Sequence, residues 1–191
     1  SSSLLRERCT LPPTIRRMLI PDIIQAIHPL QVISRSDDLQ NLDIRHLLTD
    51  SRLLGSEPEA TLFFALKTEK NDGARYIPTL IDKGVRCFVL TEEQHYTILH
   101  HTTPHYTTPH HTILLLVEDA LAALQSLAAY KRSLYHGPVI GITGSNGKTV
   151  VKEWLYQLLK DDYRITRSPK SYNSQIGVPL SVWQLSEKTE L

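Results

Sequence analysis

The chain contains, from Val139 to Thr149, the sequence VIGITGSNGKT. The apolar run from Pro138 to Ile142 predicts a short buried strand, and the glycine-rich turn after it leads into a helical pattern from about Lys148 to Lys160. Gly144 and Gly147 let the backbone curl so that several N–H groups point at one anion. The positive N-terminal end of the helix faces the same anion. Together these features predict a phosphate-binding loop within an α/β fold.

The side chains of this loop carry the predicted nucleotide chemistry. Lys148 is predicted to reach the outer phosphates of a nucleoside triphosphate, and the Thr149 hydroxyl is predicted to ligate the accompanying Mg²⁺. Lys148 and Thr149 are therefore the catalytic candidates, Thr149 is the candidate metal ligand, and a nucleoside triphosphate and Mg²⁺ are the expected cofactors, with ATP implied by the family resemblance described below. The predicted nucleotide-binding residues of the loop are Gly144, Ser145, Asn146, Gly147, Lys148 and Thr149.

The loop departs from the common P-loop pattern, which places its first glycine where this chain has Ile142. This chain instead has the tighter spacing of Gly144 and Gly147, followed directly by the Lys-Thr pair. A glycine-rich turn that merely joins a strand to a helix is the alternative interpretation. The strand–turn–helix context and the Lys-Thr pair favour nucleotide triphosphate binding.

The tighter loop resembles the ATP loop of the Mur ligases, which build the peptide of bacterial cell-wall precursors. Further segments resemble this family in the same order along the chain: Thr49–Arg52 with Thr61–Lys67, Asn71–Ile77 and Tyr172–Leu180. The first segments resemble the family's first domain, which holds a UDP-sugar, so the resemblance implies UDP-substrate contacts by Ser51 and Arg52. From the last segment it implies an ATP contact by Asn173, although Ser174 stands where the family usually has a second asparagine.

The last segment is most similar to the family members that join D-alanyl-D-alanine to UDP-N-acetylmuramoyl-tripeptide. The resemblance therefore implies an ATP-dependent amide ligase of peptidoglycan precursor synthesis that works through an acyl phosphate. UDP-N-acetylmuramoyl-tripeptide and D-alanyl-D-alanine are its implied partners. Residues 167–173 and 182–185 resemble versions fused to an alanine racemase, which implies a C-terminal racemase domain in the full-length protein.

Without the resemblance, Asp50-Ser51-Arg52 is a polar turn between apolar segments. Such a stretch is most often only a turn, in which Asp50 bonds to nearby backbone. The planar guanidinium of Arg52 equally suits a diphosphate. Both interpretations of these residues stay open at this stage.

Composition is that of an ordinary globular protein. The 191 residues are 41% hydrophobic and 21% charged, with a formal net charge of +1. The chain has no excess of positive charge that would indicate a nucleic-acid partner. No apolar run approaches the ~20 residues that span a membrane. Cys87 lies in an apolar run and predicts a buried thiol rather than part of a disulfide framework. Because the N-terminus also lacks the pattern of a secretory signal, we expect a cytoplasmic protein.

Alternating helix and strand patterns predict an α/β architecture in two parts. A disordered extension is predicted over residues 1–17 and a small α/β domain over residues 18–136, which the resemblance implies is the UDP-muramoyl substrate-binding domain. Residues 137–191 are predicted to be the truncated start of a P-loop nucleotide-binding α/β domain. Such a domain needs several strands on either side of its loop strand. We therefore expect an incomplete ATP-binding domain and no ligase activity from this segment alone.

Within the first part, apolar periodicity predicts individual elements. Strands are predicted at residues 62–66, 86–90 and 113–117, and helices at residues 19–27, 76–81 and 120–134. Asp119 is predicted to cap the last of these helices, and Gly84 to end the middle one. Trp154 and Trp183 lie on apolar stretches and are predicted to be core residues.

Residues 92–112, rich in His, Thr and Pro, are predicted to form a low-complexity surface loop. The histidines of this segment raise zinc binding as an alternative: His95, His100, His101, His105, His110 and His111. The prolines disfavour a helix that would align such ligands, so the loop is the favoured interpretation.

Two functions from other classes stay open. A different P-loop enzyme, such as a small-molecule kinase or a glutamate-adding ligase, would share the loop at residues 144–149. A UDP-sugar-binding module with an unfolded second part would bind its sugar nucleotide without needing Lys148.

Overall fold

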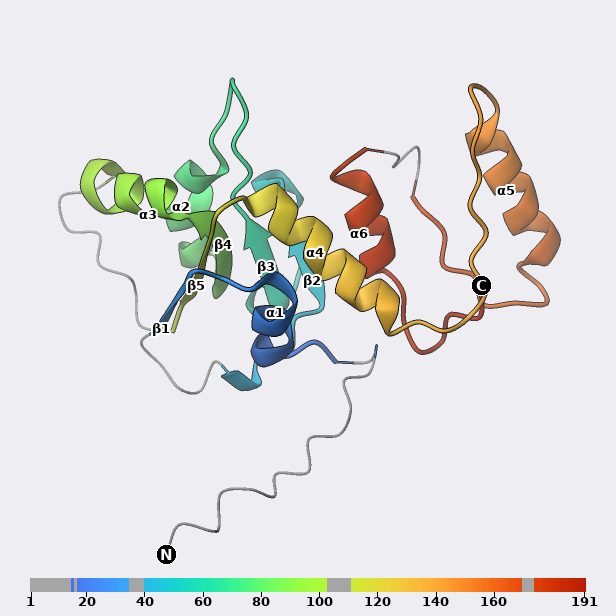
Figure 1. Ribbon diagram of the computed structural model, residues 1–191, viewed down its shortest axis with the longest axis horizontal. Coiled ribbons are helices and arrows are strands. Elements are labelled where there is room, and N and C mark those ends of the chain that lie inside the picture. The colour runs from blue at the N-terminus through green and yellow to red at the C-terminus, as the bar shows by residue number, and fades with distance from the viewer. Residues whose placement is uncertain (1–14, 16, 35–39, 103–110, 170–173) are drawn as a thin grey trace, which may run out of the picture.

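The computed structural model describes residues 15, 17–34, 40–102, 111–169 and 174–191. It contains a five-stranded sheet in the order β1-β5-β4-β3-β2, flanked by helices (Figure 1). The strands are β1 Gln31–Ser34, β2 His46–Leu48, β3 Thr61–Phe64, β4 Cys87–Thr91 and β5 Ile113–Val117. The helices are α1 Ile20–Ile27, α2 Ile77–Asp82, α3 Glu92–Thr97, α4 Ala120–Ser133, α5 Lys148–Leu159 and α6 Gly177–Trp183. The predicted α/β class is confirmed.

The sheet is mostly parallel. Strands β2, β3, β4 and β5 run in one direction, and β1 pairs antiparallel with β5. Phe63 lies opposite Phe88, which in turn lies opposite Leu114. Every residue of β3 and β5 is buried, as expected for a parallel sheet that is covered on both faces. The carboxyl ends of β2, β3 and β4 therefore meet at one edge of the sheet.

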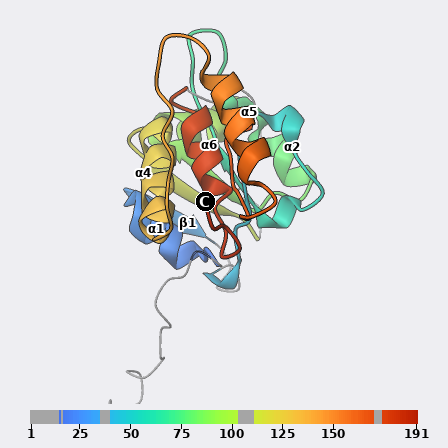
Figure 2. The same cartoon turned by 90° about the vertical axis from the view of Figure 1, so that its right-hand side faces the viewer.

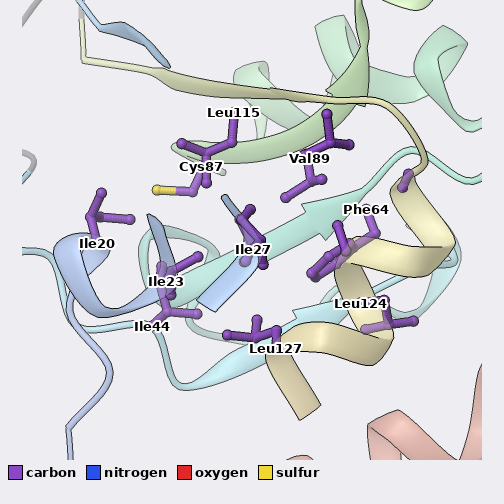
Figure 3. Close-up of a cluster of buried hydrophobic side chains, with 14 of the residues drawn as sticks. Ile20, Ile23, Ile27, Ile44, Phe64, Cys87, Val89, Leu115, Leu124 and Leu127 are labelled. Atoms are coloured by element: carbon purple, nitrogen blue, oxygen red, sulfur yellow. The ribbon is translucent and has the colours of Figure 1, made fainter. Parts of the chain in front are cut away.

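Helices cover both faces of the sheet, so the fold has layers of helix, sheet and helix (Figure 2). On one face, α1 and α4 pack over a core that includes Ile23, Phe64 and Leu124 (Figure 3). On the other face, α2 packs over Phe63 and Phe88, whose rings meet edge to face with centroids 6.2 Å apart. Full burial of each such side chain contributes about 1.5–3 kcal/mol. The two cores hold the sheet edge in place.

Local sequence signals explain where helices begin and end. Asp119 accepts hydrogen bonds from the N–H groups of Leu121 and Ala122 at 2.8 and 3.0 Å, which caps α4 as predicted. Gly84, after α2, has a φ of +99°, a left-handed conformation that glycine adopts without strain. Within the described ranges, no helix combines the length and the hydropathy that crossing a lipid bilayer requires.

The prediction of a surface loop over residues 92–112 is wrong for residues 92–102. Residues 92–97 form α3, and a π-helical turn follows over Ile98–Thr102. A capping box explains this start, because the side chains of Thr91 and Gln94 bond to each other's backbone N–H groups. The prolines behind the loop prediction, Pro104 and Pro109, lie outside the described residues. No three metal-ligating side chains cluster within the described residues, and the zinc alternative stays untested.

Residues 137–191 show the largest differences between the predicted and the observed structure. Residues 138–142 form no strand, and Val139 and Ile140 are 56% and 52% exposed. A strand needs a neighbour for its backbone hydrogen bonds, and the described residues supply none at this segment. α5 begins at the predicted residue but buries no side chain, and Trp154 is 66% exposed rather than in the core. In Figure 1, α5 stands apart from the sheet.

α6 connects this region to the sheet. Trp183 is buried, as predicted, and its Nε1 donates a hydrogen bond to the carbonyl of Arg45 at 2.9 Å. Its ring lies under the ammonium of Lys131, a residue of α4. α6 thus packs against both α4 and the edge strand β2.

Candidate functional site

The predicted phosphate loop is an exposed turn that opens α5. Gly144 has a φ of +147° and Gly147 a φ of +80°, conformations that glycine reaches without the steric cost of a β-carbon. Gly147 is the N-cap of α5, and no side chain caps this helix, whereas Asp119 caps α4. The first N–H groups of a helix have no acceptor within it. At α5 they are consequently suited to an anion.

Lys148 closes this loop with its own side chain. Its Nζ donates a hydrogen bond to the carbonyl of Gly144, so the ammonium is held over the turn. A phosphate oxygen would replace this carbonyl, because a charged acceptor forms the stronger hydrogen bond. Thr149 is exposed at the start of the helix, where a hydroxyl can reach a metal ion that accompanies phosphates. The residues present fit a polyphosphate and its magnesium ion.

A cavity of about 450 Å³ lies beside the loop, between α5 and α6. Lys148 and Thr149 line one part of it, but many of its walls are apolar and include Leu155, Leu159 and Val182. Two of the other cations that line it already have partners, because Lys152 Nζ donates to the carbonyl of Ser168 at 2.8 Å and Arg167 pairs with Glu153. We therefore locate the predicted anion site on the exposed side of the loop and not in this cavity.

The carboxyl edge of the sheet is the second candidate site. The buried side chain of Gln94 connects its loops, because its Nε2 donates to the carbonyl of Ala65 at 2.9 Å and to Asp72 Oδ1 at 2.7 Å. Its Oε1 accepts a hydrogen bond from the N–H of Thr91 at 2.9 Å. These bonds tie the ends of β3 and β4 to the loop before α2. Ligands of α/β sheets bind at this kind of edge.

Ser51 and Arg52 lie at the same edge, directly after β2, in a short 3-10 turn whose N-cap is Asp50. The Arg52 guanidinium forms a fork with the Asp50 carboxylate, with Nε–Oδ1 and Nη2–Oδ2 distances of 2.9 and 2.7 Å. Hydrogen bonding from the Arg52 side chain lowers the pKa of Asp50 to about 2. The same fork suits a diphosphate, so a ligand would have to displace the carboxylate of Asp50.

Replacing Arg52 with glutamine is expected to raise the pKa of Asp50 toward its ordinary value of 3.8, because the Arg52 hydrogen bond is the main cause of the shift. The carboxyl carbon of Asp50, followed by NMR against pH, measures this. A lowered pKa stabilises the fold above the ordinary pKa, and this stabilisation is lost as the pH falls through about 2. Arg45→Gln is the control, because Arg45 pairs with Glu57 instead. An unchanged Asp50 midpoint in Arg52→Gln would contradict the assignment.

The predicted site residues fall into two separate groups. Residues 144–149 form one loop, and Ser51 and Arg52 lie together at the sheet edge. Asn173 lies outside the described residues. The roles of all these residues stay predictions. Sequence reasoning missed Gln94, although Thr91 and Gln94 have the spacing of a capping box that could have revealed α3.

Comparison with known families decides the relationship. Residues 43–132 match the profile described as Mur ligase family, catalytic domain, and residues 142–191 match the Mur ligase middle domain. The chain belongs to the Mur ligase family. The predicted resemblance is confirmed, and the two matches include both candidate sites of this Mur ligase chain.

Two curated relatives of this Mur ligase chain are UDP-N-acetylmuramoyl-tripeptide–D-alanyl-D-alanine ligases. The protein of Borreliella burgdorferi is 28% identical over 174 residues, which are 91% of this chain and 37% of the relative. The protein of Bacillus subtilis is 34% identical over 155 residues, which are 78% of this chain and 29% of the relative. The chain therefore spans about a third of the length of the curated relatives it matches.

Solved structures share the fold. A MurF from Acinetobacter baumannii has a TM-score of 0.72 at 24% identity, covering 92% of this chain and 34% of that one. This likeness concerns the fold alone. A MurF ligase from Thermotoga maritima in complex with ADP has a TM-score of 0.59 at 27% identity, covering 76% of this chain and 30% of that one.

Proposed function

We propose that this Mur ligase chain is part of an enzyme that joins D-alanyl-D-alanine to UDP-N-acetylmuramoyl-tripeptide in peptidoglycan precursor synthesis. The observation that carries the proposal is the loop at residues 144–149, whose left-handed glycines and uncapped helix start suit the phosphates of ATP. The names of the relatives in Borreliella burgdorferi and Bacillus subtilis support this choice of reaction. A cytoplasmic location and a racemase domain in the full-length protein remain part of the proposal.

In the proposed reaction, the γ-phosphoryl group of ATP passes to the terminal carboxylate of the tripeptide, which gives an acyl phosphate and releases ADP. The amine of D-alanyl-D-alanine then displaces phosphate and forms the amide bond. Backbone N–H groups of residues 144–149 stabilise the phosphate charge, and Lys148 follows the transferred group. Thr149 holds Mg²⁺, which supplies further neutralisation of charge on the phosphates when it is bound.

The carboxyl edge of the sheet has a separate proposed role. Ser51 and Arg52 bind the UDP end of the substrate, with Arg52 exchanging Asp50 for the diphosphate. Binding energy far from the reacting carboxylate then orients that carboxylate for phosphoryl transfer. The loops that Gln94 connects give this edge a fixed shape in advance.

The isolated 191 residues are expected to bind ligands but not to ligate. The proposed chemistry needs acidic ligands for metal and a domain that binds D-alanyl-D-alanine, and we assign neither to the described residues. An assay of ADP release with both substrates tests this expectation. Turnover by the isolated chain that depends on both substrates would refute it.

A thermal-shift series on the 191-residue chain tests the proposed ligands. ATP–Mg²⁺ and UDP-N-acetylmuramoyl-tripeptide should each raise the melting temperature, and together they should raise it further, because each binds only the folded chain. UDP-glucose is the control for the muramoyl-tripeptide part and should give a smaller shift. A shift with ATP alone would favour another P-loop enzyme, and a shift with the UDP ligand alone would favour a sugar-nucleotide module.

A further inference from the structure

A buried lysine lies outside both candidate sites. Lys131, on α4, is 7% exposed and is the one charged residue among the buried residues of the described ranges. Its Nζ lies 4.1 Å from the centroid of the Trp183 ring. Within the same ranges, no carbonyl or carboxylate accepts a hydrogen bond from this ammonium. The Nζ atom itself is not fully buried, so an anion from outside the described chain can reach it and pair with its charge.

Lys131 lines a cavity of about 580 Å³ between β2 and α6. This volume is in the range of pockets that bind small organic molecules. Apolar and aromatic side chains, among them Met18, Ile44 and Trp183, form much of its wall. Asp50 also lines it, so the cavity extends to the carboxyl edge of the sheet. A ligand with an apolar body and one charged group matches these walls.

The charges around the cavity balance, except for that of Lys131. The cavity is lined by three cations, Arg45, Lys131 and Lys188, and by two acids, Asp50 and Glu187; Arg45 pairs with Glu57 and Asp50 with Arg52. Glu57 Oε2 also accepts a hydrogen bond from His46 Nε2 at 2.7 Å. One positive charge is therefore left for one negative charge of a ligand.

Lys131 keeps its charge at neutral pH. Burial lowers the pKa of Lys131 to about 8, and the negative charge of Asp43 raises this pKa in part. Asp43 itself accepts a hydrogen bond from the N–H of Met18 at 3.1 Å and faces Arg17 at 4.0 Å. The ammonium form of Lys131 thus prevails below its pKa, and Asp43 has partners of its own.

We propose that this cavity binds an organic monocarboxylate whose carboxylate pairs with Lys131 and whose apolar or aromatic body packs on Trp183. A single ammonium offers a point charge and not the bidentate fork that favours phosphate. A dianionic phosphate would also bring one more negative charge than the cavity can balance. The inference rests on Lys131, Trp183 and the cavity they share, and not on the proposed ligase reaction, although the cavity borders the carboxyl edge at Asp50.

Fluorescence of Trp183 can test the proposal directly. The experiment uses the full 191-residue chain with Trp154→Phe, which leaves Trp183 as the single tryptophan of the two. Trp154 is 66% exposed, so this replacement removes little packing. Phenylacetate should change the emission of Trp183 saturably, whereas the neutral phenylacetamide and the dianionic phenyl phosphate should bind at least tenfold more weakly. Lys131→Met should weaken phenylacetate binding at least tenfold.

The melting temperature of Lys131→Met separates lost binding from lost folding. Because the ammonium has no oxygen acceptor among the described residues, replacing Lys131 by an apolar side chain of similar length should leave that temperature unchanged or raise it. A lower melting temperature would mean that the lysine serves packing on Trp183, and it would overturn the inference. So would the absence of a saturable response, or equal binding of phenylacetate by Lys131→Met. Equal binding of phenylacetamide or phenyl phosphate would overturn the choice of a monocarboxylate.

Discussion

Lys148→Ala is expected to abolish the rise in melting temperature that ATP and Mg²⁺ produce in this chain. The mutation removes the ammonium that donates to the carbonyl of Gly144, and with it the side-chain charge that we propose for binding the outer phosphates. At a ligand concentration 100 times Kd, binding stabilises the folded state by roughly 2.7 kcal/mol, which is about 5–11 °C for a chain of this size. Differential scanning fluorimetry with and without ATP–Mg²⁺ measures the loss.

Lys160→Ala is the matched control for this experiment. Lys160 is exposed and follows the last residue of the same helix, so its removal changes the net charge equally without touching the loop. It should keep the full ATP shift. The shift caused by UDP-N-acetylmuramoyl-tripeptide should survive in both variants, because the carboxyl edge of the sheet is intact. An ATP shift that persists in Lys148→Ala would remove the basis of the nucleotide assignment.

Gly73→Val is expected to destabilise the carboxyl edge by about 1–3 kcal/mol. A β-carbon at Gly73 would meet the backbone N and O of Leu66 at 3.0 Å and the carbonyl carbon of Ala65 at 3.1 Å. All of these are backbone atoms, which cannot move aside as the end of a flexible side chain does. The loop before α2 must therefore shift, and Asp72 moves with it away from Gln94. Binding of the UDP ligand should weaken together with stability.

Gly55→Val is the control for this second mutation. Gly55 is exposed, and a β-carbon there would meet no atom within 4 Å. Thermal unfolding and titration with UDP-N-acetylmuramoyl-tripeptide should therefore resemble those of the unmodified chain. If Gly73→Val melts like Gly55→Val and binds the UDP ligand equally well, the close approach to Leu66 has no role in shaping the edge.

Much of the structure over residues 18–136 was predictable because its signals are local. Ile113–Val117 is a continuous apolar run that becomes β5 with the predicted bounds, and Asp119 is placed to cap the helix that follows. Cys87 is fully buried, as its apolar surroundings predicted. In each case, neighbours within a few positions decide the conformation, so one sequence contains the necessary information.

The differences arise where distant residues decide the outcome. Trp154 and Trp183 lie in similar apolar stretches, yet only Trp183 finds a surface to pack on, formed by α4 and the backbone of Arg45. The segment at 138–142 has the composition of a strand but no partner strand among the described residues. The spacing of apolar residues shows which face of an element should be buried. It does not show whether another element is present to cover that face.

The two candidate sites also differ in how far the sequence could predict them. The loop at residues 144–149 could be predicted because glycine spacing and the Lys-Thr pair are contiguous. The side-chain contacts at the sheet edge could not, because Gln94 bonds to Ala65 and Asp72 across separations of 29 and 22 positions. Nor could a pattern predict that Lys131 is buried against Trp183.

The hydrogen bond between Trp183 and Arg45 joins positions 138 apart in the chain. Because α4 and α6 both lie on the sheet, the stretch between them is a bridge anchored at each end. The glycine turn and α5 lie between these two anchors in the chain. Because both ends of the stretch are held, the turn has a high effective concentration beside the sheet.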